Sequence, residues 1–245
     1  MKGVILAAGT ASRLRPLTDA LPKCLLPLGN GTLLGRTLDN LEAVGLSDIV
    51  IVTGYLEDKI KDHVRERHPR IRPTFITNSV YASTNNIYSL WLAREEIVRA
   101  GMLLLDSDIL FDSRILETLL RSGHPDVLAL KTGFPLGDEE IKVQADADMR
   151  IRKIGKDVPP SLAAGESIGI ELFSPALLDA LFKSIGRRVA AGDVNTFYES
   201  AFQDVIDDGA AIRAVDIGDR LAIEIDTIDD FRSAERDIVP LLPRS

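Results

Sequence analysis

Three cationic side chains follow the first apolar segment of the chain. Arg13, Arg15 and Lys23 come shortly after the small-residue run 7–12, which itself follows the strand-like residues 4–6. Small residues leave backbone N–H groups accessible, and a helix that begins after them would add the positive end of its dipole. Such a segment could hold the phosphates of a small molecule. A strand, a turn and a helix also begin most α/β proteins, so the spacing alone leaves a structural interpretation open.

Two other apolar segments end in carboxylates. The run that starts at Met102 leads into Asp106 and Asp108, and the segment near residue 225 carries Glu224 and Asp226. Ligands of open α/β sheets bind at the carboxyl ends of the strands, and carboxylates there suit Mg²⁺. Taken alone, an Asp can instead cap a following helix, and edge-strand charges can prevent aggregation.

The common phosphate-binding motifs are absent from the sequence. Gly9 and Lys23 do not fit the spacing GxxxxGK(S/T), and no GxGxxG follows the first strand, which argues against P-loop NTPases and Rossmann dehydrogenases. The string LAAGTASRLRPLTDALPKCLLPL instead resembles the signature of the nucleotidylyltransferase (NDP-sugar pyrophosphorylase-like) family, usually written LAAG-x-G-(S/T)-R-x-x-P-x-T-x-x-x-P-K-x-L. Ala11 stands where many members have glycine, so the backbone approach to the nucleotide is expected to differ slightly here.

Later segments extend this resemblance over nearly the whole chain. TNNIYSLWLAREE, GKDVPP, GESIGIELFS and IEIDTIDDF are similar to the choline-phosphate cytidylyltransferase-like branch, and LLLDSDILFD also resembles aminoethylphosphonate cytidylyltransferases. The resemblance implies a Rossmann-like, mixed and mostly parallel sheet flanked by helices, of the nucleotide-diphospho-sugar transferase type. It implies an enzyme that transfers a nucleoside monophosphate, CMP from CTP being favoured, to a small phosphorylated acceptor such as phosphocholine and releases pyrophosphate.

The resemblance also assigns roles to the charged residues. Arg13 and Lys23 would hold the triphosphate, and Lys156 would align the attacking acceptor for an in-line displacement at the α-phosphorus. A single lysine such as Lys156 is otherwise most often a solvated surface residue. The cofactor Mg²⁺ would be held by Asp108 and Asp226, with Asp106 and Glu224 placed behind them.

Polar residues between positions 78 and 91 could either cap a helix or contact a base. The resemblance implies that the nucleotide is contacted both by the end of the first strand with the small-residue turn and by this polar segment. The residues implied are Leu6, Ala7, Ala8, Gly9, Thr10, Thr84, Asn85, Asn86 and Ser89. Contacts with the acceptor are expected from Tyr88, Lys156, Glu166 and Gly169. A quaternary ammonium would need aromatic faces. The candidates for that role are Tyr81, Tyr88, Trp91, Phe197 and Tyr198.

Composition limits the other possibilities. The 245 residues suffice for one nucleotidyltransferase domain over 1–245, with a nucleotide-binding half of about 1–110 and an acceptor-binding half with a lid of about 111–235. The net charge of −8 argues against nucleic-acid binding. Cys24 is the single cysteine, so no internal disulfide can form. We find no signal peptide or membrane-spanning run and expect a cytoplasmic protein; members of this family often form homodimers.

Strand and helix patterns alternate along the chain, which favours a parallel sheet. Strands are expected at 4–7, 49–53, 102–105, 211–215 and 221–225, and helices at 33–44, 57–67, 89–100, 174–182 and 196–207. Segments 140–145 and 150–155 predict a β-hairpin that reaches out of the main sheet as a lid.

Two other functional classes remain open. A glycosyltransferase could use Asp106-Ser107-Asp108 as a metal site, but it would have no use for the phosphate-binding segment from Gly9 to Lys23. A non-catalytic nucleotide-binding module would be expected to lose a carboxylate or a lysine, and this chain keeps all of them. The acceptor also stays open among phosphocholine, a polyol phosphate such as inositol phosphate, a sugar 1-phosphate and an aminoalkylphosphonate.

Overall fold

Alternate residues of the first strand, β1 (Lys2–Ala7), face opposite sides of the molecule. In the computed structural model, which describes residues 1–242, Val4 and Leu6 belong to one buried cluster, and Ile5 and Ala7 belong to another. Both faces of this strand are therefore covered by apolar side chains, as in parallel sheets with helices on both sides.

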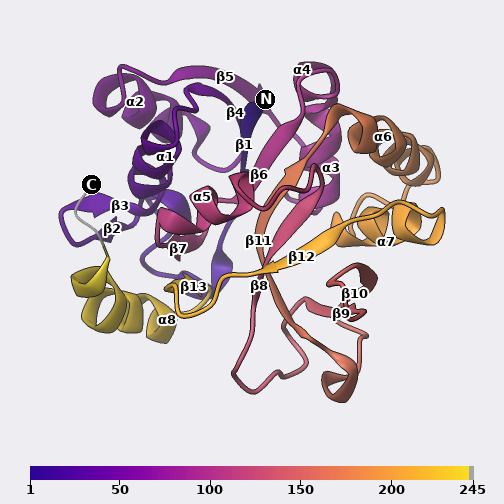
Figure 1. Cartoon of the computed structure of the whole chain (residues 1–245). Coiled ribbons are helices and arrows are strands. Elements are labelled where there is room, and N and C mark those ends of the chain that lie inside the picture. Colours follow the sequence, from indigo (N-terminus) through magenta and orange to yellow (C-terminus); the bar gives the residue numbers. More distant parts are fainter. Residues whose placement is uncertain (243–245) are drawn as a thin grey trace.

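Helices supply the outer side of each cluster, and they lie on both sides of the sheet (Figure 1). One face is covered by α1 (Leu33–Ala43), α2 (Glu57–Arg67) and α5 (Arg114–Leu120). The other is covered by α3 (Asn86–Leu92), α4 (Arg94–Ile97), α6 (Pro175–Ala190) and α7 (Glu199–Asp207).

A nine-stranded mixed sheet lies between these layers. Its parallel part has the order β6-β1-β4-β5, and it adds β4 (Asp48–Thr53), β5 (Arg72–Thr77) and β6 (Met102–Asp106) to β1. The long strand β11 (Gly165–Phe173) runs antiparallel to β6 and also pairs with β8 (Val127–Lys131), beside which β12 (Arg213–Asp216) lies parallel. The predicted mixed α/β sheet flanked by helices is confirmed.

The predicted hairpin is present as β9 (Lys142–Ala145) and β10 (Ile151–Gly155), which pair antiparallel. β9 also pairs with the beginning of β11, so the hairpin continues the central sheet instead of standing apart from it. Lys142 is 1% exposed, and its ammonium donates to the carbonyls of Gly137 and Glu140 at 2.9 and 3.3 Å. This buried lysine therefore fixes the loop that leads into the hairpin.

Three helix predictions were wrong in detail. A 3-10 turn, η1 (Ser12–Leu14), stands where a helix was expected after the small-residue run. Arg15 ends this turn in an extended conformation because Pro16 follows it, and residues before proline avoid helical geometry. The helix expected over 89–100 is divided at Ala93 into α3 and α4. The helix expected over 174–182 is α6, which continues to Ala190.

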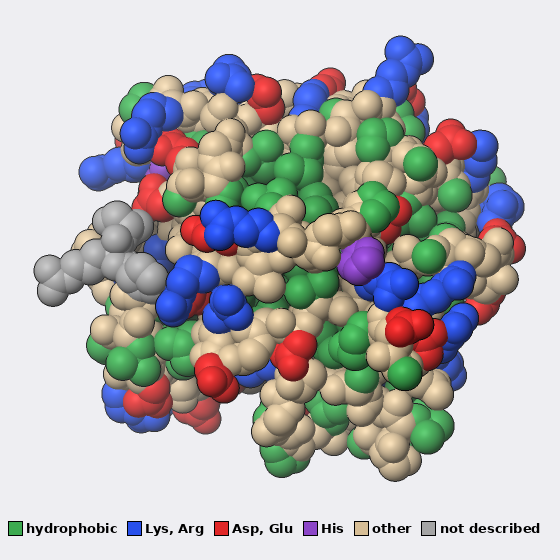
Figure 2. Space-filling model, viewed as in Figure 1, with side chains coloured by type: hydrophobic (Ala, Val, Ile, Leu, Met, Phe, Trp, Pro, Cys, Tyr) green, Lys and Arg blue, Asp and Glu red, His purple; other side chains and the backbone are tan. Residues whose placement is uncertain are grey.

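Short elements complete the chain. β2 (Pro27–Leu28) pairs with β3 (Gly31–Thr32), and β7 (Ile109–Phe111) pairs with β13 (Ala222–Glu224). Helix α8 (Ile228–Ser233) precedes a π-helical turn and a last 3-10 turn. Acidic and basic side chains lie interspersed on the face shown in Figure 2. In the part of the chain that the structure describes, no helix combines the length and apolarity needed to span a membrane.

Candidate active site

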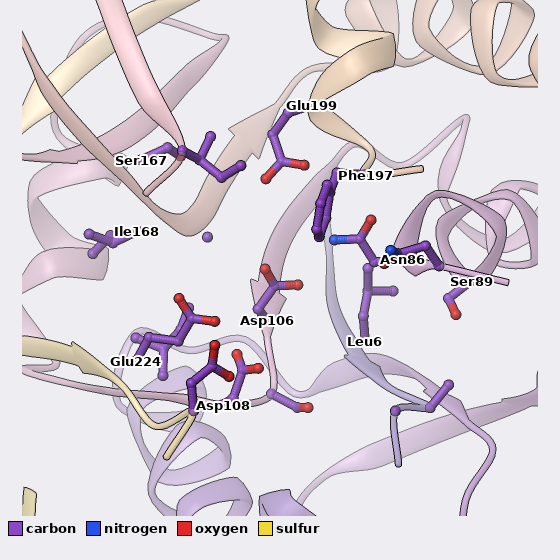
Figure 3. A pocket seen from close by; sticks show the side chains of 18 of the residues that line it. Leu6, Asn86, Ser89, Asp106, Asp108, Ser167, Ile168, Phe197, Glu199 and Glu224 are labelled. Carbon is purple, nitrogen blue, oxygen red and sulfur yellow. Dashed lines mark hydrogen bonds between the residues drawn. The ribbon is translucent and has the colours of Figure 1, made fainter. Parts of the chain in front are cut away.

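A cavity of about 410 Å³ opens beside the carboxyl ends of β1 and β6 (Figure 3). Ligands of open α/β sheets bind at this edge. The predicted site residues that line the cavity are Leu6, Ala8, Gly9, Arg13, Thr84, Asn85, Asn86, Ser89, Asp106, Asp108, Lys156, Glu166, Gly169, Glu224 and Asp226. Ala7, Thr10, Lys23 and Tyr88 are not among the lining residues.

Lys23 lies directly behind the cavity wall, at the start of the 3-10 turn η2 (Lys23–Leu25). Its ammonium donates to Asp108 Oδ2 at 3.0 Å and to Asp226 Oδ1 at 2.6 Å, and its side chain is 11% exposed. Burial lowers the pKa of Lys23, but the charges of Asp108 and Asp226 more than offset this, so its pKa is raised. The lysine is therefore held charged between two carboxylates.

A short strand pair brings these two carboxylates together. Asp108 immediately precedes β7 and Asp226 follows β13, in which Glu224 is paired with Ile109. The amide of Ile225 donates to the Asp108 carbonyl at 3.0 Å. The β7–β13 pair thus places segments that are far apart in the sequence on one wall of the cavity.

The start of α8 fixes the backbone after β13. Thr227 and Asp230 form a capping box, in which the Asp230 carboxylate accepts from the Thr227 amide at 2.7 Å. The same carboxylate accepts from the Asp226 amide at 3.2 Å. Asp226 is therefore anchored by a helix cap, which satisfies backbone donors that the helix itself leaves without partners.

The carboxylates of Asp108, Glu224 and Asp226 could hold a metal ion. One oxygen of each lies within 4.8 Å of the others. Asp108 Oδ1 is buried and has no hydrogen-bond partner within residues 1–242. Burial, and then the charges of Asp108 and Asp226, raise the pKa of Glu224 to about 8. An orphaned carboxylate oxygen beside two further carboxylates is a donor set that fits a hard divalent cation.

Asp106 lies apart from that cluster, at the end of β6. Its Oδ2 accepts from the buried Tyr198 hydroxyl at 2.9 Å. Burial, followed by the charges of Asp108 and Glu199, raises its pKa well above the usual value. Gly169 has φ +69°, and a Cβ there would come within 2.8 Å of the Asp106 carboxylate. Gly169 is therefore required for the close approach of β11 to Asp106.

The turn after β1 adopts the conformation that glycine favours. Ala11 has φ 48° and ψ 48°, in the left-handed region, and its carbonyl accepts from the Thr18 hydroxyl at 2.9 Å. Arg13 follows, and its guanidinium donates to Asp226 Oδ2 at 2.6 Å although its side chain is 65% exposed. The position where the family signature carries glycine is thus left-handed in this chain, a conformation that glycine adopts without strain.

Several side chains of the polar segment before and within α3 already form hydrogen bonds inside the protein. The side-chain amide of Asn78 donates to Thr84 Oγ1 at 3.1 Å and to Ser89 Oγ at 3.2 Å. The side-chain oxygen of Asn85 caps α3, and that of Asn86 accepts from the Tyr198 amide at 2.9 Å. Within residues 1–242, the side-chain nitrogens of Asn85 and Asn86 donate to no protein group, so they can donate to a ligand in the cavity.

Lys156 lines the cavity from the turn that follows β10. Its ammonium contacts Glu139 Oε2 at 2.9 Å and lies 5.2 Å from the centre of the Phe197 ring. Glu166 also lines the cavity, and burial together with the charge of Glu140 raises its pKa to about 7. Of the five candidate aromatic residues, Tyr81 and Phe197 line the cavity, whereas Tyr88, Trp91 and Tyr198 do not.

Sequence reasoning missed several residues that line the cavity: Asn78, Ser107, Ile109, Glu139, Glu140, Ile141, Ser167, Ile168 and Glu199. Glu199 is 5% exposed at the beginning of α7, and burial raises its pKa to about 7. A glutamate in the first turn of a helix is common, so its sequence position does not distinguish it from an ordinary dipole partner.

Comparison with known proteins gives consistent matches. The Nucleotidyl transferase family model matches residues 2–126. Choline-phosphate cytidylyltransferase from Streptococcus pneumoniae is 28% identical over 96% of this chain and 97% of its own length. CMP-5'-(3-aminopropyl)phosphonate synthase from Streptomyces rubellomurinus is also 28% identical over 96% of this chain, but over 38% of its own length.

Solved structures agree on the fold. The structure of CTP:phosphocholine cytidylyltransferase from Streptococcus pneumoniae matches with a TM-score of 0.76 and 23% identity, over 96% of this chain and 97% of that chain. The inositol-1-phosphate CTP transferase from T. maritima matches with a TM-score of 0.80 and 19% identity, over 94% of this chain and 90% of that chain.

Proposed function

The chain belongs to the nucleotidyl transferase family and is an enzyme of that class, and on this premise we propose that it transfers CMP from CTP to a small acceptor that carries a phosphate or phosphonate group. The attacking group is a phosphate or phosphonate oxygen of the acceptor. The observation that carries the proposal is the joint contact of Lys23 with Asp108 and Asp226, two carboxylates of a cavity that Arg13 and Lys156 line as well. Cationic and metal-binding groups thus surround one space.

The reaction is an in-line displacement. An acceptor oxygen forms a bond to the α-phosphorus, the bond from that phosphorus to the bridging oxygen of the β-phosphate breaks, and pyrophosphate leaves. Arg13 and Lys23 neutralise the triphosphate, and the exposed Arg13 can move from Asp226 to a phosphate. Lys156 orients the acceptor, for which its contact with Glu139 must open. Positioning and charge neutralisation are the main contributions that this chemistry requires from a protein.

Asp108, Glu224 and Asp226 are the residues that would hold a divalent cation, for which we propose Mg²⁺. A bound cation supplies positive charge to the phosphate oxygens. We further propose that Asn85 and Asn86 donate to the acceptor atoms of cytosine. The nucleotide then lies against residues of about 1–110, and the acceptor lies against residues of about 111–235.

The proposal is tested by measuring pyrophosphate release in a grid of substrates with Mg²⁺. CTP, UTP, dTTP, GTP and ATP are each combined with phosphocholine, glucose 1-phosphate, inositol 1-phosphate and 2-aminoethylphosphonate. We expect release that depends on both substrates and is fastest with CTP. Release that is fastest with another nucleotide would refute the base assignment, and no release in any combination would refute nucleotidyl transfer.

A further inference from the structure

One carboxylate of the cavity has no function in the mechanism described above. Glu199 is 5% exposed, and its Oε2 has no hydrogen-bond partner among residues 1–242. Figure 3 shows its carboxylate pointing into the cavity between Phe197 and Ser167. A buried carboxylate oxygen without a donor is costly, so the geometry indicates that a ligand supplies the missing donor.

Phe197, two residues earlier, offers a second feature that suits a cation. Its side chain is 40% exposed although it is large and apolar, and it lines the same cavity. The ammonium of Lys156 occupies this ring at 5.2 Å from its centre, and when Lys156 turns to the phosphate end of the acceptor, the ring becomes free for another ammonium group. Aromatic faces attract ammonium groups through the ring quadrupole.

The charges of the cavity residues that come from the second half of the chain also favour a positively charged ligand group. Of the lining residues between 139 and 199, Glu139, Glu140, Glu166 and Glu199 are acidic, and Lys156 is the one basic residue within the described part of the chain. A phosphorylated acceptor brings negative charge into this acidic environment. An acceptor whose other end is positively charged offsets the repulsion, whereas a sugar or polyol phosphate does not.

We propose that Glu199 and Phe197 form the subsite for a primary ammonium group, so that the acceptor is a short aminoalkyl phosphate or phosphonate. This proposal rests on the proposed nucleotidyl transfer and narrows its acceptor. A primary ammonium has N–H donors for Glu199 Oε2, whereas a trimethylammonium has none. A trimethylammonium would instead rely on aromatic faces, and within the described residues only Tyr81 and Phe197 supply such faces to the cavity.

A methylation series tests this assignment with the full chain, CTP and Mg²⁺. kcat/KM for pyrophosphate release is measured with phosphoethanolamine, its N-methyl and N,N-dimethyl derivatives, phosphocholine and 2-aminoethylphosphonate. Ethyl phosphate and inositol 1-phosphate serve as acceptors without an ammonium group. We expect kcat/KM to fall with each methyl group, with phosphocholine at least tenfold below phosphoethanolamine or 2-aminoethylphosphonate. Whichever of phosphoethanolamine and 2-aminoethylphosphonate has the higher kcat/KM identifies phosphate or phosphonate as the attacking group.

Variants separate the subsite from a structural role. Glu199→Gln keeps the shape of the side chain and removes its charge, and it should lower kcat/KM for the amine acceptor about 100-fold while KM for CTP and kcat/KM for ethyl phosphate stay unchanged. Glu117→Gln, an exposed residue of α5 that contacts Arg121, is the matched control and should leave all values unchanged. An equal loss with ethyl phosphate would assign Glu199 a structural role and overturn the proposal.

The outcomes distinguish this inference from the function on which it rests. If phosphocholine or inositol 1-phosphate is the best acceptor, the primary-ammonium subsite is wrong although nucleotidyl transfer stands. If no acceptor releases pyrophosphate with any nucleoside triphosphate, the proposed function itself fails and the subsite with it.

Discussion

The Lys23 ammonium contacts two carboxylates at once, Asp108 Oδ2 at 3.0 Å and Asp226 Oδ1 at 2.6 Å. These two carboxylates, with Glu224, are also the groups that could bind a metal ion. The lysine therefore neutralises the cluster in the absence of a metal ion. Because a divalent cation would bind the same carboxylates, we propose that lysine and metal compete for them, which would leave the ammonium available to a phosphate once a metal is bound.

Replacing the lysine should make the fold depend on the metal. Lys23→Met leaves the two carboxylates without their counterion, so we expect a lower melting temperature in EDTA, most of which Mg²⁺ at millimolar concentration restores. Turnover should fall about 100-fold because a phosphate ligand is lost. Differential scanning fluorimetry with and without Mg²⁺ measures the first effect. Lys183→Met, which breaks an exposed pair with Asp179, is the control, and an equal Mg²⁺ response in both variants would contradict the competition.

The left-handed turn at Ala11 predicts a stabilising substitution. An L-residue in this region costs roughly 1–2 kcal/mol, and glycine avoids that cost while losing more entropy on folding. Ala11→Gly should therefore raise the free energy of unfolding by up to about 1 kcal/mol, or the melting temperature by about 2–4 °C. Ala191→Gly is the control because Ala191 has φ −83°, and it should be neutral or destabilising. Urea unfolding that shows both variants equally destabilised would refute the strain at Ala11.

The contact between α6 and α7 predicts a dependence of stability on pH. Both oxygens of Asp204 on α7 accept from the Arg188 guanidinium of α6 at 2.7 Å, and these bonds hold the pKa of Asp204 below its usual value. A lowered carboxyl pKa stabilises the fold above the unfolded pKa of about 3.9, and this contribution is lost as pH falls through the lower folded pKa. Asp204→Asn should therefore be less stable than the native chain at pH 7, and the difference should shrink below pH 4.

Calorimetry between pH 7 and pH 3 measures that difference. Asp179→Asn, which removes an exposed pair with Lys183, is the control and should track the native chain at every pH. If the difference in stability between Asp204→Asn and the native chain stays constant with pH, the ion pair does not control that difference.

Lys156 should affect the acceptor and not the nucleotide. Lys156→Met removes the charge that orients the attacking group, so we expect KM for the acceptor to rise at least tenfold while KM for CTP is unchanged. Steady-state kinetics with each substrate varied in turn measure both constants. Lys153→Met is the control, because Lys153 lies on strand β10, which ends just before Lys156, and the substitution breaks only an exposed pair with Asp157. A rise in KM for CTP in the Lys156 variant would place the lysine on the nucleotide instead.

The parts of the site that belong to local sequence patterns could be predicted from the sequence. Lys23, Asp108 and Asp226 stand in a long signature and at the ends of apolar strands, and the structure brings all three together. The hairpin strands and helix α2 could also be predicted from their periodicity. Helix α3 was harder because Ala93 interrupts a pattern that reads as one helix.

Residues that depend on tertiary packing could not be predicted in this way. Strand β11 carries Glu166 and the fully buried Glu171, so it lacks the apolar alternation that identifies a strand. Glu199 and Glu139 reach the cavity because α7 and the loop before β9 pack beside it, and their neighbours in the sequence give no sign of this. Buried carboxylates are visible only once the packing that buries them is known.

The central claim is that the carboxylates beside Lys23 hold the cation that nucleotidyl transfer requires. The most direct measurement is pyrophosphate release from CTP by the native chain, Asp108→Asn and Asp226→Asn, each with an amine acceptor in Mg²⁺ and in EDTA, with folding checked by circular dichroism. We predict release by the native chain in Mg²⁺ only, and at least a 1,000-fold loss in both folded variants, on the order of the losses seen when a main electrostatic group is removed. Near-native turnover by either variant, or by the native chain in EDTA, would contradict the account.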